Sequence, residues 1–194
     1  MKTIQTIIDK DRYTFERLDD CIQSFKLFSK LVRTHKGNKS NLKWIILSLH
    51  DFLQTLFILS LAETSCSSIL ERNKKDETDN TPYDIATSKA NRGMMKHFEE
   101  LYAMFKKKYT DINHREFGVA INYLNNLRND LIHFKYDTLY ISYNDFKTKL
   151  CSIIKFLIIA LREITCPQFC LRPLLKRYLI TRLSQLYSNL DFYL

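Results

Sequence analysis

An arginine and a histidine five positions apart are the residues of this chain best suited to chemistry. Arg128 and His133 lie in the segment 127–134, which is written L-R-N-D-L-I-H-F and is otherwise largely apolar. Arginine keeps its charge at physiological pH and can bind a phosphate through two hydrogen bonds, whereas histidine can take or give a proton near neutral pH. The pair indicates chemistry on a phosphodiester.

RNA can be cut without a metal, because its own 2′-hydroxyl can attack the adjacent phosphorus. The reaction needs a base for the hydroxyl proton, an acid for the leaving 5′-oxygen and a cation for the charge that builds on the phosphate. We expect His133 to be the general acid or base and Arg128 to hold the phosphate. Asn129, one turn before His133, could orient the imidazole or bind a phosphate oxygen.

The same residues also have purely structural interpretations. His133 could be a helix-terminal histidine bonded to a carbonyl, and Arg128 could pair with Asp130 or another acid. Residues five apart on an ideal helix also point about 140° away from each other. Arg128 and His133 of one chain are therefore poor direct partners unless the helix bends or the arginine side chain reaches round it.

The composition predicts helices and favours an acidic partner. The chain has 194 residues with only three glycines and three prolines, which favours one domain of long helices. Thirty Lys and Arg against 21 Asp and Glu give a net charge of +9. Such a charge favours nucleic acid or another polyanion as partner, although a basic surface can also serve solubility alone. The sequence shows no glycine-rich phosphate loop, nucleophile elbow or cluster of metal ligands, so we expect neither a cofactor nor a metal.

The cysteines and the start of the chain indicate a reduced, cytoplasmic setting. The five cysteines are odd in number and form no disulfide framework, and Cys166 and Cys170 lack the further ligands that a zinc site needs. Residues 1–20 mix charged and apolar side chains without the apolar core of a signal peptide. We expect the apolar runs 44–62 and 153–161 to be buried core helices, and therefore no membrane span.

Apolar residues recur at three- and four-residue steps along most of the chain, which is the spacing of one buried helix face. We expect an all-α, up-down bundle of about five to six helices in a single domain over residues 1–194. The polar stretch 65–88 is expected to be a loop. The helices are expected over residues 11–34, 41–64, 91–109, 115–134, 144–163 and 167–190.

Two basic segments have open interpretations. Lys106, Lys107 and Lys108 end the helix expected over 91–109, where positive charge complements the helix dipole, but the same three lysines could track an RNA backbone. The final helix carries a basic face, for which association with a membrane surface is a weaker alternative.

Three segments match a known family in order and spacing. They are W-I-I-L-S-L-H-D-F-L-Q at 44–54, F-E-E-L-Y at 98–102 and Y-L-N-N-L-R-N-D-L-I-H-F at 123–134. The last contains an Arg-x4-His motif, and together they resemble bacterial toxin and defence proteins of the HEPN superfamily (higher eukaryotes and prokaryotes nucleotide-binding). The resemblance covers roughly residues 40–145. It implies a HEPN-like helical bundle and a homodimer in which two motif helices build one composite site from two arginines and two histidines.

The resemblance also bears on three further residues. HEPN proteins carry a polar residue from an earlier helix near the site, so His50 is expected to approach Arg128, with Gln54 one turn further on the same face. A buried, hydrogen-bonded core histidine is the alternative for His50. Tyr136 lies three residues after His133, whereas the tyrosine that some HEPN toxins expose to adenylation by a partner lies two residues after the histidine.

The function that the resemblance implies is that of a metal-independent endoribonuclease. It would cut single-stranded RNA in a bacterial toxin–antitoxin pair or in anti-phage defence, with an antitoxin or another defence protein as partner. Two alternatives remain open. One is a non-catalytic HEPN module that binds RNA or a nucleotide, or acts as a dimerising sensor. The other is a structural helical protein whose apolar faces dock a partner.

Overall fold

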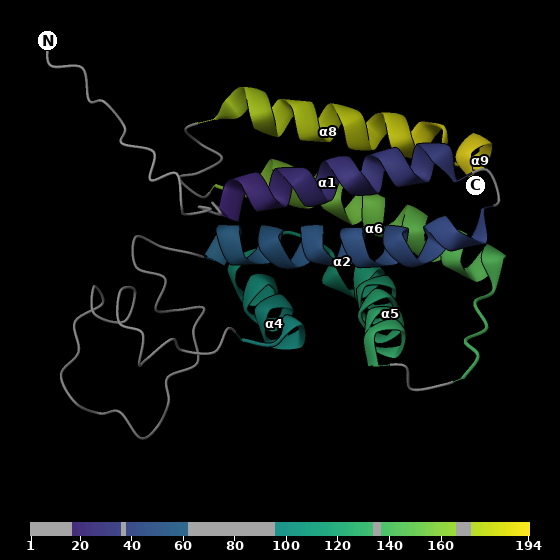
Figure 1. Cartoon of the computed structure of the whole chain (residues 1–194). Coiled ribbons are helices and arrows are strands. Elements are labelled where there is room, and N and C mark those ends of the chain that lie inside the picture. The colour runs from purple at the N-terminus through teal and green to yellow at the C-terminus, as the bar shows by residue number, and fades with distance from the viewer. Residues whose placement is uncertain (1–16, 36–37, 62–95, 134–136, 166–171) are drawn as a thin grey trace, which may run out of the picture.

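The computed structural model describes residues 17–35, 38–61, 96–133, 137–165 and 172–194 (Figure 1). Within these ranges every regular element is a helix, which confirms the predicted all-α bundle. The helices are α1 (Arg17–Thr34), α2 (Lys39–Leu61), α4 (Phe98–Lys108), α5 (His114–His133), α6 (Tyr143–Glu163), α8 (Pro173–Ser188) and α9 (Leu190–Tyr193). The expected 65–88 loop and Tyr136 lie outside the described residues.

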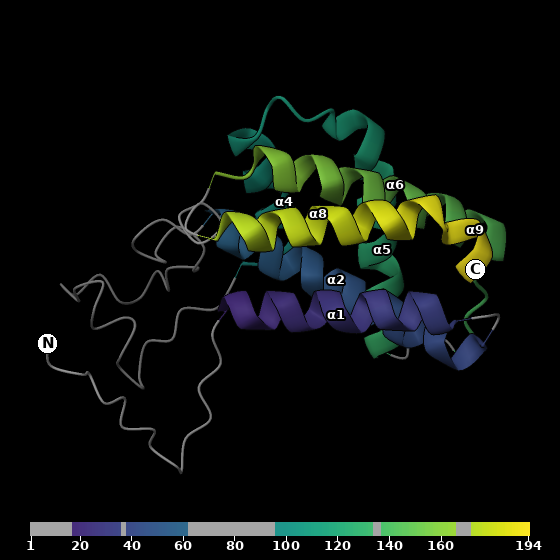
Figure 2. The ribbon, with the colours of Figure 1, turned by 90° about the horizontal axis from the view of Figure 1, so that it is seen from above.

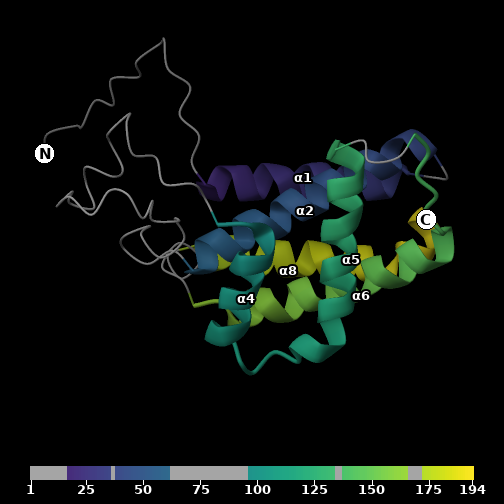
Figure 3. The ribbon, with the colours of Figure 1, turned by 90° about the horizontal axis from the view of Figure 1, so that it is seen from below.

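The helices form two groups on opposite sides of α2. On one side α8 lies between α1 and α6, with all three running alongside one another (Figures 1 and 2). On the other side α4 and α5 cross α2 steeply instead of running alongside it, as the view from below shows (Figure 3). The expected bundle is thus present, with two of its helices laid across the others. The crossing brings the start of α4 and the second half of α5 to the same face of α2.

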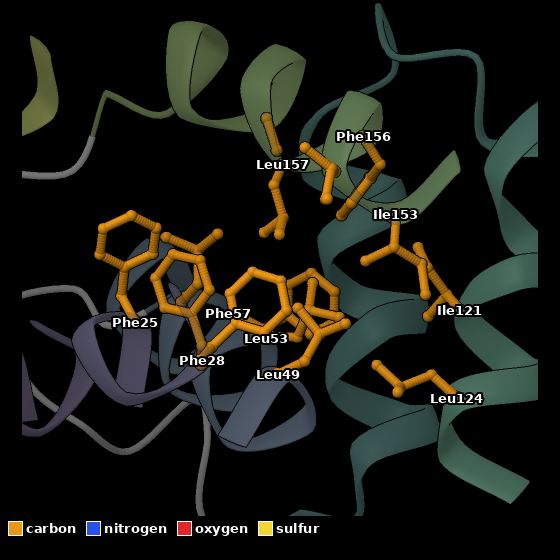
Figure 4. Close-up of a cluster of buried hydrophobic side chains, with 14 of the residues drawn as sticks. Phe25, Phe28, Leu49, Leu53, Phe57, Ile121, Leu124, Ile153, Phe156 and Leu157 are labelled. Atoms are coloured by element: carbon orange, nitrogen blue, oxygen red, sulfur yellow. The ribbon is translucent and has the colours of Figure 1, made fainter. Parts of the chain in front are cut away.

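The core is built around α2 and is rich in aromatic rings. Phe57 is fully buried, and its ring lies 4.8 Å from that of Phe105, 5.5 Å from that of Tyr102 and 5.6 Å from that of Phe98. Figure 4 shows side chains from α1, α2, α5 and α6 pointing into this one core. Burial of so much apolar surface is the main stabilising term of the fold.

One helix of the described residues, Ser40–Leu61 within α2, is long and apolar enough to cross a membrane. However, 78% of its most apolar window is buried inside the bundle, as in the core helix of a soluble protein. The expectation that the run 44–62 is a core helix is confirmed for its described part.

Two lysines fix the ends of neighbouring helices through carbonyl groups that the helices leave unpaired. Lys108 donates a hydrogen bond of 2.8 Å to the carbonyl of Ser60 at the end of α2. Lys176 of α8 donates to the carbonyls of Arg162 and Ile164 at the end of α6, at 2.8 and 2.9 Å. Both contacts place positive charge at the negative end of a helix dipole. Part of the basic character of the chain therefore serves its own packing.

Candidate functional site

A half-enclosed pocket of about 350 Å³ lies where α4 begins, between α2 and α5. These three helices can be followed in Figure 3. The pocket is lined by His50, Gln54, Lys96, His97, Phe98, Glu99, Asn125, Arg128 and Asn129. Its volume falls within the range of about 300–1,000 Å³ that is usual for small-molecule sites.

Helix α5 places three polar side chains on the pocket because of their spacing. Asn125, Arg128 and Asn129 stand at i, i+3 and i+4, and side chains at this spacing share one helix face. The apolar residues Ile121 and Leu124 of the same helix are buried in the core (Figure 4). Packing of these residues fixes the rotation of α5 and so holds the polar triplet toward α2 and α4.

Helix α2 contributes His50 and Gln54, which stand one turn apart on the same face. His50 is only 3% exposed and Gln54 is half-buried. The sequence-based expectation that His50 lies near Arg128 agrees with their placement, since both line the same pocket and the arginine charge acts on the histidine. His50 is also buried and hydrogen-bonded, as the alternative interpretation expected, so the two interpretations are compatible.

A chain of hydrogen bonds joins the three helices at the pocket. The Asn125 amide nitrogen donates to Oε1 of Glu99 over 3.2 Å, and Oδ1 of Asn125 lies 3.1 Å from Nε2 of His50. The Phe98 ring packs on the His50 ring with the centroids 4.4 Å apart. Asn125 is 5% exposed, so this buried amide has both ends paired, as buried polar groups require.

Burial lowers the pKa of His50 to about 4. The hydrogen bond with Asn125 raises the pKa and the Arg128 charge lowers it further, while Asp51 has a smaller raising effect. Desolvation penalises the charged imidazolium, which explains the direction. His50 is therefore neutral near pH 7, and its ring cannot act there as a cationic phosphate ligand or as a general acid.

Arg128 is the positive group that α5 presents to the pocket. Its side chain is half-buried, and Nη1 donates a hydrogen bond of 3.0 Å to Oδ1 of Asn129. No carboxylate of the described residues forms an ion pair with it, so the suggested pairing with Asp130 is not seen there. A guanidinium held by a neutral amide keeps most of its donors for a ligand.

His133 lies apart from this pocket. It is the last residue of α5, its side chain is exposed, and it does not line the pocket. The ideal-helix angle of about 140° between Arg128 and His133 accounts for the separation within one chain. Asn129 bonds Arg128, and no hydrogen bond joins it to the His133 imidazole among the described residues.

The three lysines of α4 lie at the other end of that helix, about 15 Å of helix length from the pocket. Lys108 is bonded to Ser60, and Lys106 lies over the Tyr102 ring with its nitrogen 5.0 Å from the centroid. Lys107 is exposed. Lys108 therefore contacts the end of α2, whereas Lys107 offers its charge to solvent.

Sequence reasoning did not identify five of the lining residues. Asn125 had a usable signal, since it stands one turn before Arg128 and Asn129. Lys96 and His97 were expected inside a helix over 91–109, but both are non-helical, which corrects that boundary. His97 has extended backbone (φ −61°, ψ 154°), and the Glu100 carboxylate accepts from its N–H at 3.3 Å, so α4 begins at Phe98. The remaining two, Phe98 and Glu99, are the first residues of α4.

No group of three or more His, Cys, Asp or Glu side chains in the described ranges could hold a metal ion. Comparison with known proteins found no matching family model, no matching curated protein and no matching solved structure.

Proposed function

We propose that this protein is a metal-independent endoribonuclease of the HEPN type that cuts single-stranded RNA as a homodimer. The observation that carries the proposal is the state of Arg128, which is held by Asn129 at an open polar pocket without an acidic partner among the described residues. An arginine presented in this way suits a phosphate. The Arg-x4-His motif and the net charge of +9 support an RNA substrate.

In the proposed reaction the RNA 2′-hydroxyl attacks the adjacent phosphorus and the 5′-oxygen leaves. Arg128 stabilises the charge that develops on the phosphate oxygens. His133, exposed at the end of α5, takes the hydroxyl proton or protonates the leaving oxygen. The products would be a 2′,3′-cyclic phosphate and a 5′-hydroxyl, and no water or metal enters this step.

A second copy of the chain would complete the site. Within one chain Arg128 lines the pocket and His133 does not, so one copy does not bring the two residues of the motif together. In a two-fold dimer that brings two α5 helices together, the His133 of one copy can approach the Arg128 of the other. Two imidazoles at one phosphate would supply both the acid and the base. We place the protein in the cytoplasm, in a toxin–antitoxin pair or anti-phage defence.

The second candidate is a non-catalytic HEPN module that binds RNA or a nucleotide. It is favoured by the composition of the pocket within one chain, where Arg128 and the neutral His50 line it and His133 lies outside. A pocket with a phosphate ligand and a neutral histidine can bind without cutting.

The test is cleavage of single-stranded RNA by purified protein in excess EDTA, with the ends of the products identified. Wild type is compared with His133→Ala and with Asn126→Ala, a matched control on an exposed position of α5 away from the pocket. The endoribonuclease proposal expects cyclic phosphate ends from wild type and Asn126→Ala and no cutting by His133→Ala. RNA binding without cutting by any of the three proteins would favour the binding module.

A further inference from the structure

The hydrogen-bond chain in the pocket determines which His50 nitrogen carries the proton. A carboxylate only accepts hydrogen bonds, so the Asn125 group facing Glu99 is the NH₂ group. The other end of the amide, which faces His50, is then the carbonyl oxygen, which also only accepts. Nε2 of His50 must therefore be the N–H donor to Asn125.

A neutral imidazole carries one ring proton, so Nδ1 of His50 is left as a hydrogen-bond acceptor. Turning the ring over would break the bond to Asn125, and the packed Phe98 ring restrains the imidazole plane. Glu99 and Asn125 thus act as positioning residues for His50. The pocket is therefore lined both by the cationic guanidinium of Arg128 and by the uncharged imidazole of His50, which is a hydrogen-bond acceptor at Nδ1.

We propose that the pocket binds one nucleotide of the RNA, with its phosphate on Arg128 and an uncharged O–H or N–H donor of the same or the adjoining nucleotide on Nδ1 of His50. The RNA ligand rests on the proposed function. A phosphate oxygen would meet a lone pair at Nδ1 of His50, and the Glu99 carboxylate also lines the pocket, so the phosphate belongs on Arg128. The donor is either a ribose 2′-hydroxyl or a base N–H group, which share this chemistry.

Two substitutions of His50 separate the roles of its two nitrogens. His50→Gln places an amide where Nε2 stood, so it can still donate to Asn125 but lacks an acceptor at the Nδ1 position. His50→Asn places an amide oxygen near the Nδ1 position and loses the reach to Asn125. We expect Gln to weaken RNA binding about tenfold and Asn to weaken it less, because an unmet donor on the ligand costs about that much.

Binding is measured on a His133→Ala background, so that the RNA stays intact, with Asn126→Ala as the control. The probes are short oligoadenylates, their 2′-fluoro forms, which lack the hydroxyl donor, and forms whose base lacks the amino group. If the 2′-hydroxyl is the donor, the protein with His50 should bind the 2′-fluoro probe more weakly than the ribose probe. The His50→Gln protein should bind the two probes equally tightly. If a base N–H group is the donor, the probe whose base lacks the amino group gives this pattern instead.

The inference is overturned if the His50→Gln protein binds RNA as tightly as the protein with His50. It is overturned as well if removing the 2′-hydroxyl or the base amino group from the probe changes the affinity of both proteins equally. It is also overturned if nitrogen NMR of the folded wild type shows the proton on Nδ1, a readout that needs neither RNA nor a variant. Failure of all RNA binding would overturn the ligand assignment as well. Intact binding with the expected His50 dependence, but no cleavage by wild type, would overturn only the ribonuclease.

Discussion

Replacing His50 by glutamine should change how the stability of the protein depends on pH. In the folded protein, burial lowers the pKa of His50 to about 4, whereas an unfolded histidine has a pKa of 6.5. Between these values the unfolded chain binds a proton that the folded protein does not. The free energy of unfolding therefore decreases as the pH falls from 6.5 to about 4, and it increases again as the pH rises back to 6.5.

The size of the effect follows from the two pKa values. One pKa unit corresponds to about 1.4 kcal/mol, so the fall from 6.5 to about 4 amounts to about 3 kcal/mol of stability lost between pH 7 and pH 4. Glutamine does not titrate and can keep the donor bond to Asn125, so the variant should lack this loss. A change of this size is a large part of the stability of an ordinary domain, about 5–15 kcal/mol.

The assay is urea unfolding of both proteins at pH 7 and pH 4. Other groups also contribute to the pH dependence: burial lowers the pKa of His35, and burial and the Asp51 charge raise that of Asp20. These contributions have opposite signs and are common to both proteins, so the comparison isolates His50. Wild type should lose about 3 kcal/mol more than His50→Gln on acidification. Equal losses would refute the desolvated, neutral His50 on which the description of the pocket depends.

Three further predictions concern packing and the basic end of α4. Asn125→Ala should lower the free energy of unfolding by about 2 kcal/mol in urea titrations at pH 7, because it leaves buried His50 unpaired. Phe57→Ala should cost about 3–5 kcal/mol in the same assay, since it removes the ring at the centre of the aromatic core. Lys108→Met should lower the free energy of unfolding by about 1 kcal/mol, because it removes the hydrogen bond to Ser60. Lys107→Met should leave stability unchanged. It should instead reduce the slope of the logarithm of the RNA-binding constant against the logarithm of the salt concentration by about one.

Each of these has a distinct opposing result. An Asn125→Ala protein as stable as wild type would mean that the polar chain across the three helices contributes no net stability. A small effect of Phe57→Ala would place the centre of the core elsewhere. If Lys107→Met leaves the salt dependence of RNA binding unchanged, the end of α4 does not contact RNA, and its lysines serve packing alone.

Much of the helical framework was predictable because the apolar spacing of each helix is local. The sequence placed one helix at 115–134 and another at 144–163, and α5 and α6 run over His114–His133 and Tyr143–Glu163. The start of α4 was not predicted correctly. The apolar periodicity continues through Lys96 and His97, but the capping of His97 by Glu100 decides where the helix begins.

The spacing of residues predicted the site only within single helices. The common face of His50 and Gln54 was predicted from their spacing, and the approach of His50 to Arg128 was predicted from the family resemblance alone. The link through Glu99 was not, because it depends on α4 and α5 crossing α2 on the same face. The apolar spacing along one chain does not specify the angle at which two helices pack against a third. The same limit applies to His133. Its angular separation from Arg128 on an ideal helix follows from the sequence, but the residues that surround it in the folded protein do not.

The most direct test of the composite ribonuclease site is complementation between two inactive variants. Arg128→Ala and His133→Ala proteins are assayed for RNA cleavage in EDTA, each alone and after being unfolded and refolded together so that mixed dimers form. A composite site predicts no cutting by either variant alone, and partial recovery in the mixture, because one mixed dimer contains one intact arginine and one intact histidine. If the mixture stays inactive although mixed dimers are present and the wild type cuts, Arg128 and His133 do not meet across a dimer and the proposed site is wrong.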